Sequence, residues 1–374
     1  MNLFFYGTLR DQALLDIVLG KPGGDLRISP AQLDGHGVFW AKGQSFPMIA
    51  QSDGCLDGLL VENLTDTHIA RLNFYEGGFA YDLRDMTVAS MGKNVACQVY
   101  WPSDSALIAG EEWLLSDWQD KWGDLSRIAA NEAMGYFPSW TATELAQRFP
   151  MIRARAQTRI QAKKYAPPVD QRAERSLQDV TIENAARAHA GFFAYDILQL
   201  RHRKFDGTIS DRLTREVFVG TDAAIVLPYD PVTDQLLLVE QWRTGPTGRH
   251  DPNPWCLEPV AGLVDPGETP ESCAMREAVE EAEVTLTRLE KVAQGYSSPG
   301  ASTEYFFLYV GLCDLSDKVE SHAGLASENE DIRTHILGFE RAMELLETGE
   351  INVIPTILTL TWLARHRLRL RGAA

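Results

Sequence analysis

The sequence has few cysteines, no long apolar run and a shortage of positive charge. Its 374 residues include five cysteines but no Cys-x-x-Cys pair, which argues against a zinc or disulfide framework and predicts buried free thiols. No apolar run approaches the roughly 18 residues that cross a bilayer. Residues 1–7 lack the basic segment of a secretory signal. We therefore expect a cytoplasmic protein without a membrane partner.

Acidic residues outnumber basic ones by 52 to 35, which gives a formal net charge of −17. A chain this acidic does not coat nucleic-acid phosphates, so we expect no nucleic-acid partner. Cations, or substrates carried on a cation, suit it better. The hydrophobic share of 45% and the charged share of 23% are typical of a globular protein. The length favours two or three domains.

Two compositions divide the chain. Residues 3–100 have the pattern of short strands, interrupted by one helix that Thr65 caps. The residues after Trp101 turn helical, with a capping box at Thr141 and Glu144. Residues 148–164 carry six basic residues and no acidic one. A patch for RNA or a membrane and a solvated helical linker are both open there, and we favour the linker because the chain is acidic.

A second strand and helix pattern begins near Asp179. Strands are expected at 223–228 and 235–241, followed by a Glu-rich helix, further strands and a terminal helix that ends at Arg371. We predict an α/β (α+β) protein with domains at 1–140 and 179–374, joined by a basic helical linker over 141–178.

A cluster of carboxylates in the second domain carries the strongest signal. Thr269 and Pro270 predict a helix start, because proline at the first helical position loses no hydrogen bond. Glu277, Glu280 and Glu281 then share one helical face within one turn. Like charges this close repel each other, and a divalent cation with a preference for hard oxygen ligands resolves the conflict. The residues alone therefore favour a magnesium site.

The same segment resembles the Nudix box, Gly-x5-Glu-x7-Arg-Glu-U-x-Glu-Glu-x-Gly-U, in which U is aliphatic. The matching positions are Gly262, Glu268, Arg276, Glu277, Glu280, Glu281 and Val284. Glu283 stands where the family has a helix-ending glycine, which predicts about 1 kcal/mol of strain if φ is positive there. The resemblance implies an α/β/α sandwich in which Glu277 and Glu281 ligate Mg²⁺, or alternatively Mn²⁺. Glu280 and the Ala261 carbonyl would be further ligands.

The resemblance extends over about residues 180–371 and is closest to bacterial ADP-ribose pyrophosphatases. The matching runs are Gly191-Phe-Phe, Arg201-His-Arg-Lys-Phe-Asp-Gly207, Arg215-Glu216, Pro228-Tyr-Asp-Pro231, Val239-Glu-Gln-Trp-Arg243, Leu257-Glu258-Pro-Val-Ala-Gly262 and Ser298-Pro-Gly300. It implies hydrolysis of ADP-ribose to AMP and ribose 5-phosphate, and an intertwined homodimer. Arg215 and Arg243 would grip the diphosphate. Phe192 would stack on adenine, and Glu258 belongs to the same substrate-binding set.

Residues 324–333 resemble the acidic loop that supplies the catalytic base in these enzymes. A glutamate on such a loop can take the proton of the attacking water. Glu328 is the predicted base and Glu330 its reserve, with Glu280 counted among the catalytic residues. Arg276 lies two helical turns beyond Glu268 and could pair with it.

Residues 1–102 resemble the gamma-glutamylcyclotransferase family, which implies a mixed β-barrel with helices. The matching runs are Phe4-Phe5-Tyr6-Gly7-Thr8-Leu9-Arg10, Phe46-Pro47-Met-Ile49, Gly58-Leu-Leu-Val61, Leu72-Asn-Phe-Tyr-Glu76-Gly77 and Tyr81-Asp-Leu-Arg84. In that family the loop matched by Tyr6-Gly7-Thr8-Leu9 cradles the substrate α-carboxylate. The glutamate matched by Glu76 acts as general base on the α-amine, which attacks the γ-amide carbonyl and releases an amine as 5-oxoproline forms.

Three alternatives stay open. The Nudix half could cleave another nucleotide sugar, ADP-glucose or UDP-glucose. The first domain could be the working cyclotransferase while the Nudix half only senses ADP-ribose. The first domain could also be a non-catalytic interaction module, with Glu76 a turn residue.

Overall fold

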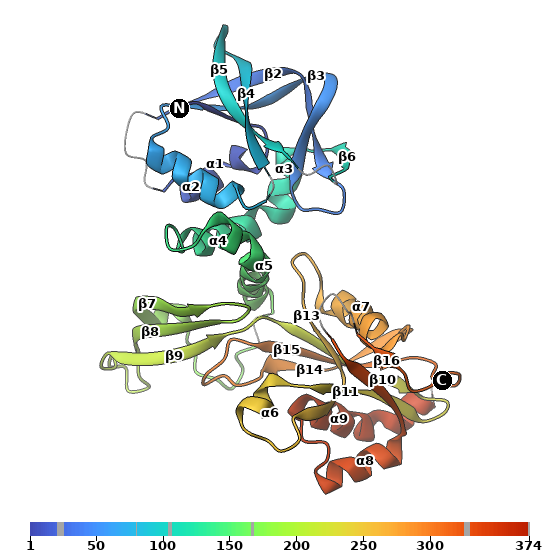
Figure 1. Cartoon of the computed structure of the whole chain (residues 1–374). Helices are drawn as coiled ribbons and strands as arrows, with labels where there is room; N and C mark the ends of the chain where they lie inside the picture. The colour runs from blue at the N-terminus through green and yellow to red at the C-terminus, as the bar shows by residue number, and fades with distance from the viewer. Residues whose placement is uncertain (21–25, 80, 104–106, 166–167, 325–329, 373–374) are drawn as a thin grey trace. The chain divides into compact units, whose positions relative to one another are not determined.

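The computed structural model describes residues 1–20, 26–79, 81–103, 107–165, 168–324 and 330–372. The chain forms two compact units, Met1–Pro168 and Val169–Ala374 (Figure 1). The boundary between the units, at residues 168 and 169, falls within the linker predicted over 141–178, and the limits of that linker remain a prediction. Both units combine sheets with helices, which confirms the expected fold class. Within the described ranges, no helix is long and apolar enough to cross a membrane.

The first unit contains a closed barrel. Its strands are β1 (Leu3–Phe5), β2 (Arg27–Ala41), β3 (Pro47–Glu62), β4 (Tyr81–Ser90), β5 (Lys93–Pro102) and β6 (Ala109–Glu112). The sheet order is β3-β1-β5-β4-β2-β6, and β2 also pairs with β3, so five strands close on themselves while β6 extends from β2. β1 runs parallel to β5 and antiparallel to β3. The barrel removes free edges from β1, which leads directly into the Tyr6–Leu9 loop.

Helices cover the barrel. They are α1 (Gln12–Leu19), α2 (Asp66–Glu76), α3 (Leu115–Trp118), α4 (Asp124–Met134) and α5 (Ala142–Lys164), with short turns η1 (Thr8–Arg10) and η2 (Gln119–Gly123). Thr65 caps α2, as its position in the sequence predicts, and Thr141 forms a complete capping box with Glu144 at the start of α5. Leu72, Trp113 and Trp118 are buried in the core shared by barrel and helices.

The prediction of a solvated linker helix over 148–164 is wrong. α5 packs against α4 and α2, and its buried face includes Ile152 and Ala156. Arg155 is buried too, because its guanidinium pairs with Glu132 of α4 at 2.6 Å. The paired charge and the apolar residues tie the basic helix to the first unit.

The second unit has two sheets. A three-stranded antiparallel sheet contains β7 (Val180–Ala190), β8 (Ala194–His202) and β9 (Leu213–Val219). The larger sheet contains β10 (Ala223–Asp230), β11 (Gln235–Trp242), β12 (Trp255–Glu258), β13 (Val260–Leu263), β14 (Arg288–Tyr296), β15 (Tyr305–Leu312), β16 (His322–Ala323) and β17 (Ile332–Gly338). The predicted strands 223–228 and 235–241 are thereby confirmed as β10 and β11. β13 pairs with β10, and β12 pairs with β11. The segment that precedes the acidic helix is therefore hydrogen-bonded to the larger sheet.

Helices lie on both faces of the larger sheet, as an α/β/α sandwich requires (Figure 1). α7 (Pro270–Ala282) contacts β10 and β13, while α8 (Phe339–Thr348) and α9 (Ile354–Arg371) pack against the opposite face. α6 (Thr244–Gly248) is a short turn after β11. Tyr229 and Leu238 are fully buried under α8 and α9.

All five cysteines are free thiols, as expected. Four are buried, but Cys55 is exposed, so the prediction of burial is wrong there. Cys55 lies on β3 in a stretch of exposed residues, where a side chain points away from the barrel core.

Candidate active site

The acidic helix α7 is built by the signals that predict it. The Thr269 side chain caps the first turn and Pro270 occupies the first helical position. Cys273, Ala274 and Ala278 are buried against the sheet. These small residues let the helix lie close to β10 and β13, and the carboxylates therefore face β13 at short range.

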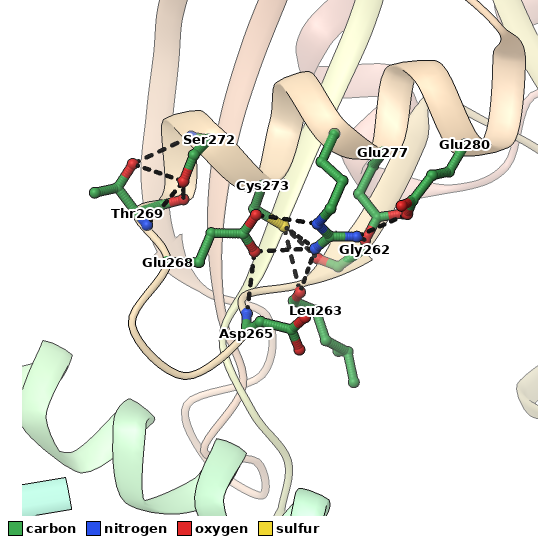
Figure 2. A network of polar contacts seen from close by, with 10 residues as sticks. Gly262, Leu263, Asp265, Glu268, Thr269, Ser272, Cys273, Glu277 and Glu280 are labelled. Atoms are coloured by element: carbon green, nitrogen blue, oxygen red, sulfur yellow. Dashed lines mark hydrogen bonds and ion pairs between the residues drawn. The ribbon is translucent and has the colours of Figure 1, made fainter. Parts of the chain in front are cut away.

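Arg276 joins four parts of the motif. Its guanidinium forms a two-pronged ion pair with Glu268, with N–O distances of 3.0 and 2.9 Å (Figure 2). Its Nη1 donates to Glu277 at 2.6 Å and to Glu280 at 2.8 Å, while Nη2 donates to the Leu263 carbonyl at 3.4 Å. The predicted pairing of Arg276 with Glu268 is present, and it fixes the loop against the helix.

Gly262 is required by the approach of Glu277. A Cβ at position 262 would lie 1.8 Å from Glu277 Oε1, so any other residue would displace this carboxylate. The neighbouring Ala261 N–H donates to Glu281 Oε2 at 3.0 Å. β13 thus holds both carboxylates in place, Glu277 by close packing and Glu281 by a hydrogen bond.

Burial raises the pKa of Glu277 to about 7 and that of Glu281 to about 8. The negative charge of Glu277 also raises the pKa of Glu281, that of Glu280 raises the pKa of Glu277, and that of Glu330 raises both values. Arg276 opposes this effect at Glu277, and Arg243 opposes it at Glu281. Buried Glu281 and half-buried Glu277 from α7 thus meet half-buried Glu330 from the segment before β17, and all three side chains carry the same type of charge.

This donor set fits a divalent cation. Carboxylate oxygens are the ligands that hard cations prefer, and a bound cation would offset the repulsion between Glu277, Glu281 and Glu330. Among the residues that the structure describes, no three His, Cys, Asp or Glu side chains already stand as a closed ligand group. The fit therefore rests on the chemistry and burial of the carboxylates.

The last residue of the motif helix departs from the family pattern, and its backbone conformation explains why glycine is usual. Glu283 has φ 50° and ψ 37°, the left-handed conformation that favours glycine. Lys318 Nζ donates to its carbonyl at 3.3 Å and to its carboxylate at 3.0 Å. These contacts offset part of the predicted strain.

Glu283→Gly is expected to relieve about 1 kcal/mol of backbone strain in the second unit. The net gain in stability is smaller by the contribution of the ion pair between Glu283 and Lys318, which the substitution removes. Glu283→Ala is the matched control, since it removes the same pair but keeps the strain. Thermal unfolding of both variants measures the difference. A glycine variant less stable than the alanine variant would show that the left-handed turn carries no strain.

The other residues predicted for the nucleotide site fall into two groups. Arg243 Nε donates to Glu258 at 2.6 Å, and the Arg243 charge lowers the pKa of Glu281, so this pair borders the acidic cluster. Arg215 lies on β9 and donates to its neighbouring Thr214 carbonyl. Phe192 stands at the β7–β8 turn, 60% exposed. Arg215 therefore lies within the three-stranded sheet, and Phe192 lies in the turn that joins two of its strands. Glu328 lies outside the described residues.

The first unit places a second titratable group at the end of α2. Burial raises the pKa of Glu76 to about 7, and no donor among the described residues hydrogen-bonds its carboxylate. Burial, then the Glu76 charge, raises the pKa of Tyr75, Tyr81 and Tyr100. The pKa of Tyr6, which begins the predicted loop, is raised by burial, then by Tyr81 and Glu76. We call these four phenols the tyrosine cluster.

Contacts in the loop agree with this arrangement. The Tyr81 hydroxyl donates to the Pro47 carbonyl at 3.5 Å, and a Cβ at Gly7 would lie 3.0 Å from the Pro47 ring. The Thr8 and Leu9 segment forms η1, in which Leu9 is buried. The structure therefore brings the predicted loop and Glu76 to one end of the barrel.

Comparison with known proteins covers both units. The NUDIX domain family matches residues 220–356, and the family described as gamma-glutamyl cyclotransferase, AIG2-like, matches residues 3–119. The ADP-ribose pyrophosphatase of Escherichia coli (strain K12) is 39% identical over 194 residues, which are 52% of this chain and 92% of that protein. The ADP-ribose pyrophosphatase of Haemophilus influenzae is 35% identical over 198 residues, 52% of this chain and 91% of that protein.

A relative named for a different substrate also matches. The GDP-mannose pyrophosphatase of Shigella flexneri is 32% identical over 157 residues, 42% of this chain and 81% of that protein. Nudix hydrolases generally use divalent metal ions, and the carboxylates of α7 are oxygen ligands of the kind that such ions bind. The chain belongs to the Nudix hydrolase family, and it carries a gamma-glutamyl cyclotransferase-like domain at residues 3–119.

Proposed function

We propose that the second unit hydrolyses the diphosphate of ADP-ribose to AMP and ribose 5-phosphate with Mg²⁺. The observation that carries the proposal is the carboxylate set of α7, in which Arg276 orders Glu277 and Glu280 while Ala261 orders Glu281. The ADP-ribose pyrophosphatases among the relatives support the choice of substrate. A sensor of ADP-ribose would need residues that bind the nucleotide, but it would not need a set of ordered carboxylates that can hold a cation.

The carboxylates divide the work. Glu277 and Glu281 would hold the cation, with Glu280 and the Ala261 carbonyl as further ligands. When bound, the cation would neutralise charge on the diphosphate and lower the pKa of the attacking water. Glu328 would take the proton of that water, with Glu330 as the alternative base.

Arginines would orient the substrate. Arg243 can present its guanidinium to the diphosphate while Glu258 fixes its direction. We place Arg215 in the same role and Phe192 against the adenine, on the strength of the family resemblance. Arg215 and Phe192 lie on the three-stranded sheet and in its β7–β8 turn. Most residues of β7 in this sheet are exposed, which supports the expected homodimer through the Nudix domain. Sedimentation at twice the chain mass of 41.7 kDa would bear out the dimer, and a monomer would refute it.

Substrate choice is tested by comparing kcat/KM for ADP-ribose, GDP-mannose, ADP-glucose and UDP-glucose. ADP-ribose is expected to give the highest value, and a higher value for any other nucleotide sugar would reassign the substrate. Glu328→Gln and Glu330→Gln are measured in the same assay. The base is expected to be the position whose loss lowers kcat about 100- to 10,000-fold. Similar small losses in both would remove the assignment from this loop.

A second function is favoured by the environment of Glu76. We propose that the first unit is a gamma-glutamyl cyclotransferase in which Glu76 takes a proton from the substrate α-amine. A carboxylate with a pKa of about 7 and no hydrogen-bond donor among the described residues suits a general base at neutral pH. Tyr6-Gly7-Thr8-Leu9 would hold the α-carboxylate through backbone N–H groups. Release of 5-oxoproline from γ-glutamyl compounds tests this function, and its absence would favour an interaction module.

A further inference from the structure

Arg153 is a half-buried cation beside the Glu76 end of the barrel. It lies on α5, beyond the residues 3–119 that match the cyclotransferase family. α5 packs against α2, the helix that ends at Glu76. The close approach depends on Gly78, because a Cβ there would lie 2.2 Å from the Ala142 carbonyl oxygen. α5 therefore packs directly against the cyclotransferase-like domain, next to the end of α2.

The guanidinium of Arg153 is held in a defined position. Its Nη1 donates to Ser45 Oγ at 2.5 Å, and its Cζ lies 5.4 Å from the centroid of the Trp122 ring. Ser45 precedes Phe46 and Pro47 in the sequence, and Pro47 is the residue whose ring lies against Gly7. Arg153 is therefore tied to the segment that borders the predicted α-carboxylate loop.

The charge of Arg153 acts on the same phenol as the charge of Glu76. The pKa of Tyr75 is raised by burial and by Glu76, and lowered by Arg153. Tyr75 also packs edge-on against Phe149, one turn before Arg153 on α5, with 6.2 Å between ring centroids. The carboxylate, the phenol and the guanidinium thus lie around one end of α2.

In the described parts of the chain, no carboxylate lies within ion-pair distance of Arg153. Burial lowers its pKa, and Tyr75 is the group that opposes the effect. Arg155, two residues along, shows the contrast, since its guanidinium is neutralised by Glu132. A half-buried guanidinium without a carboxylate costs stability, and an anion supplied by a ligand would remove that cost.

We propose that Arg153 is a specificity-determining residue that binds a carboxylate on the amine portion of the γ-glutamyl substrate. The inference rests on the proposed cyclotransferase function. That function assigns the α-carboxylate to the Tyr6–Leu9 loop and the α-amine to Glu76, which leaves a carboxylate of the leaving group for Arg153. A planar guanidinium matches a carboxylate with two hydrogen bonds. The substrate class is therefore a γ-glutamyl amino acid rather than a γ-glutamyl amine.

The reaction balances without a further reactant. The α-amine nitrogen bonds to the γ-carbonyl carbon, and the bond from that carbon to the leaving nitrogen breaks. Glu76 accepts one proton from the attacking amine, and this proton passes to the leaving nitrogen as its bond to the carbon breaks, which restores the Glu76 carboxylate. The products are 5-oxoproline and a free amino acid, whose carboxylate Arg153 would hold until release.

The test uses the full chain and two substrates that differ in one carboxylate, γ-glutamylalanine and γ-glutamylethylamide. We expect the wild type to show a kcat/KM for γ-glutamylalanine about 10- to 100-fold higher. Arg153→Gln should abolish this ratio and leave the kcat/KM for the ethylamide within about threefold, which also shows that the variant is folded. Arg153→Lys should retain part of the ratio. Arg159→Gln, an exposed arginine of the same helix, is the control and should retain the whole ratio.

The outcomes separate the two levels of the proposal. Equal rates on both substrates in the wild type, or an Arg153→Gln variant that loses both rates by the same factor, would overturn the role of Arg153 and leave the cyclotransferase function standing. Wild-type protein that neither cleaves nor binds either compound would overturn both.

Discussion

Glu281→Gln is expected to lower kcat for ADP-ribose hydrolysis about a thousandfold. Glu281 is 3% exposed, and its Oε2 accepts the Ala261 N–H at 3.0 Å. Glutamine has the same shape and its amide oxygen can accept the same bond, so the fold should be retained. The variant loses a negative ligand for the cation, which is worth about 4 kcal/mol of transition-state stabilisation if the cation is held through this residue.

Steady-state kinetics over a series of Mg²⁺ concentrations measures the effect. The concentration needed for half-maximal rate should rise together with the fall in kcat. Glu283→Gln is the control, because this neighbouring carboxylate is exposed and bonds to Lys318 instead. A Glu281→Gln variant that keeps its rate within tenfold of wild type would remove Glu281 from the metal site.

Glu76→Gln is expected to lower 5-oxoproline release about 100- to 10,000-fold, the range for loss of a general base. Because the pKa of Glu76 is about 7, wild-type kcat/KM should rise with pH through about 7 and level off above it. The variant should lose this step. A rate that keeps its pH dependence in Glu76→Gln would assign the base to another group.

The same substitution has a stability effect that does not depend on activity. The pKa of Glu76 lies above its ordinary value of 4.5, so the folded state keeps a proton that the unfolded state has lost between about 4.5 and 7. Wild-type stability therefore falls as pH rises through this window, and the full cost, about 3 kcal/mol, is present above it. Glu76→Gln should raise the Tm at pH 8 and leave it unchanged at pH 4. A Tm unchanged at both pH values would contradict the raised pKa of Glu76.

The Nudix half was predictable because local signals and a long motif agree. Thr269 and Pro270 mark the start of the helix by backbone chemistry, and the spacing of Glu277, Glu280 and Glu281 is set by helical geometry. The role of Gly262 could not be derived from spacing, since the 1.8 Å conflict with Glu277 depends on how β13 lies against α7.

The environment of Glu76 was less predictable. The sequence pointed to Glu76 and to Tyr6 through a family resemblance, but it gave no sign that Arg153 joins them. The prediction of a solvated linker relied on the basic residues of this segment and left its apolar residues out of account. Apolar residues recur there at helical spacing and indicate a buried face: Leu145, Phe149, Ile152, Ala156 and Ile160. Which helix covers that face is decided by tertiary packing, which a single sequence does not encode in its local pattern.

The central claim is that the Nudix half hydrolyses ADP-ribose, and incubation of the full chain with ADP-ribose and Mg²⁺ tests it most directly. AMP and ribose 5-phosphate are measured by chromatography, with Glu281→Gln and Glu328→Gln alongside and with the metal removed by a chelator. The expected result is equimolar AMP and ribose 5-phosphate from the wild type, lost in both variants and without metal. Tight binding of ADP-ribose with no release of AMP would contradict the claim and make this half of the chain a sensor.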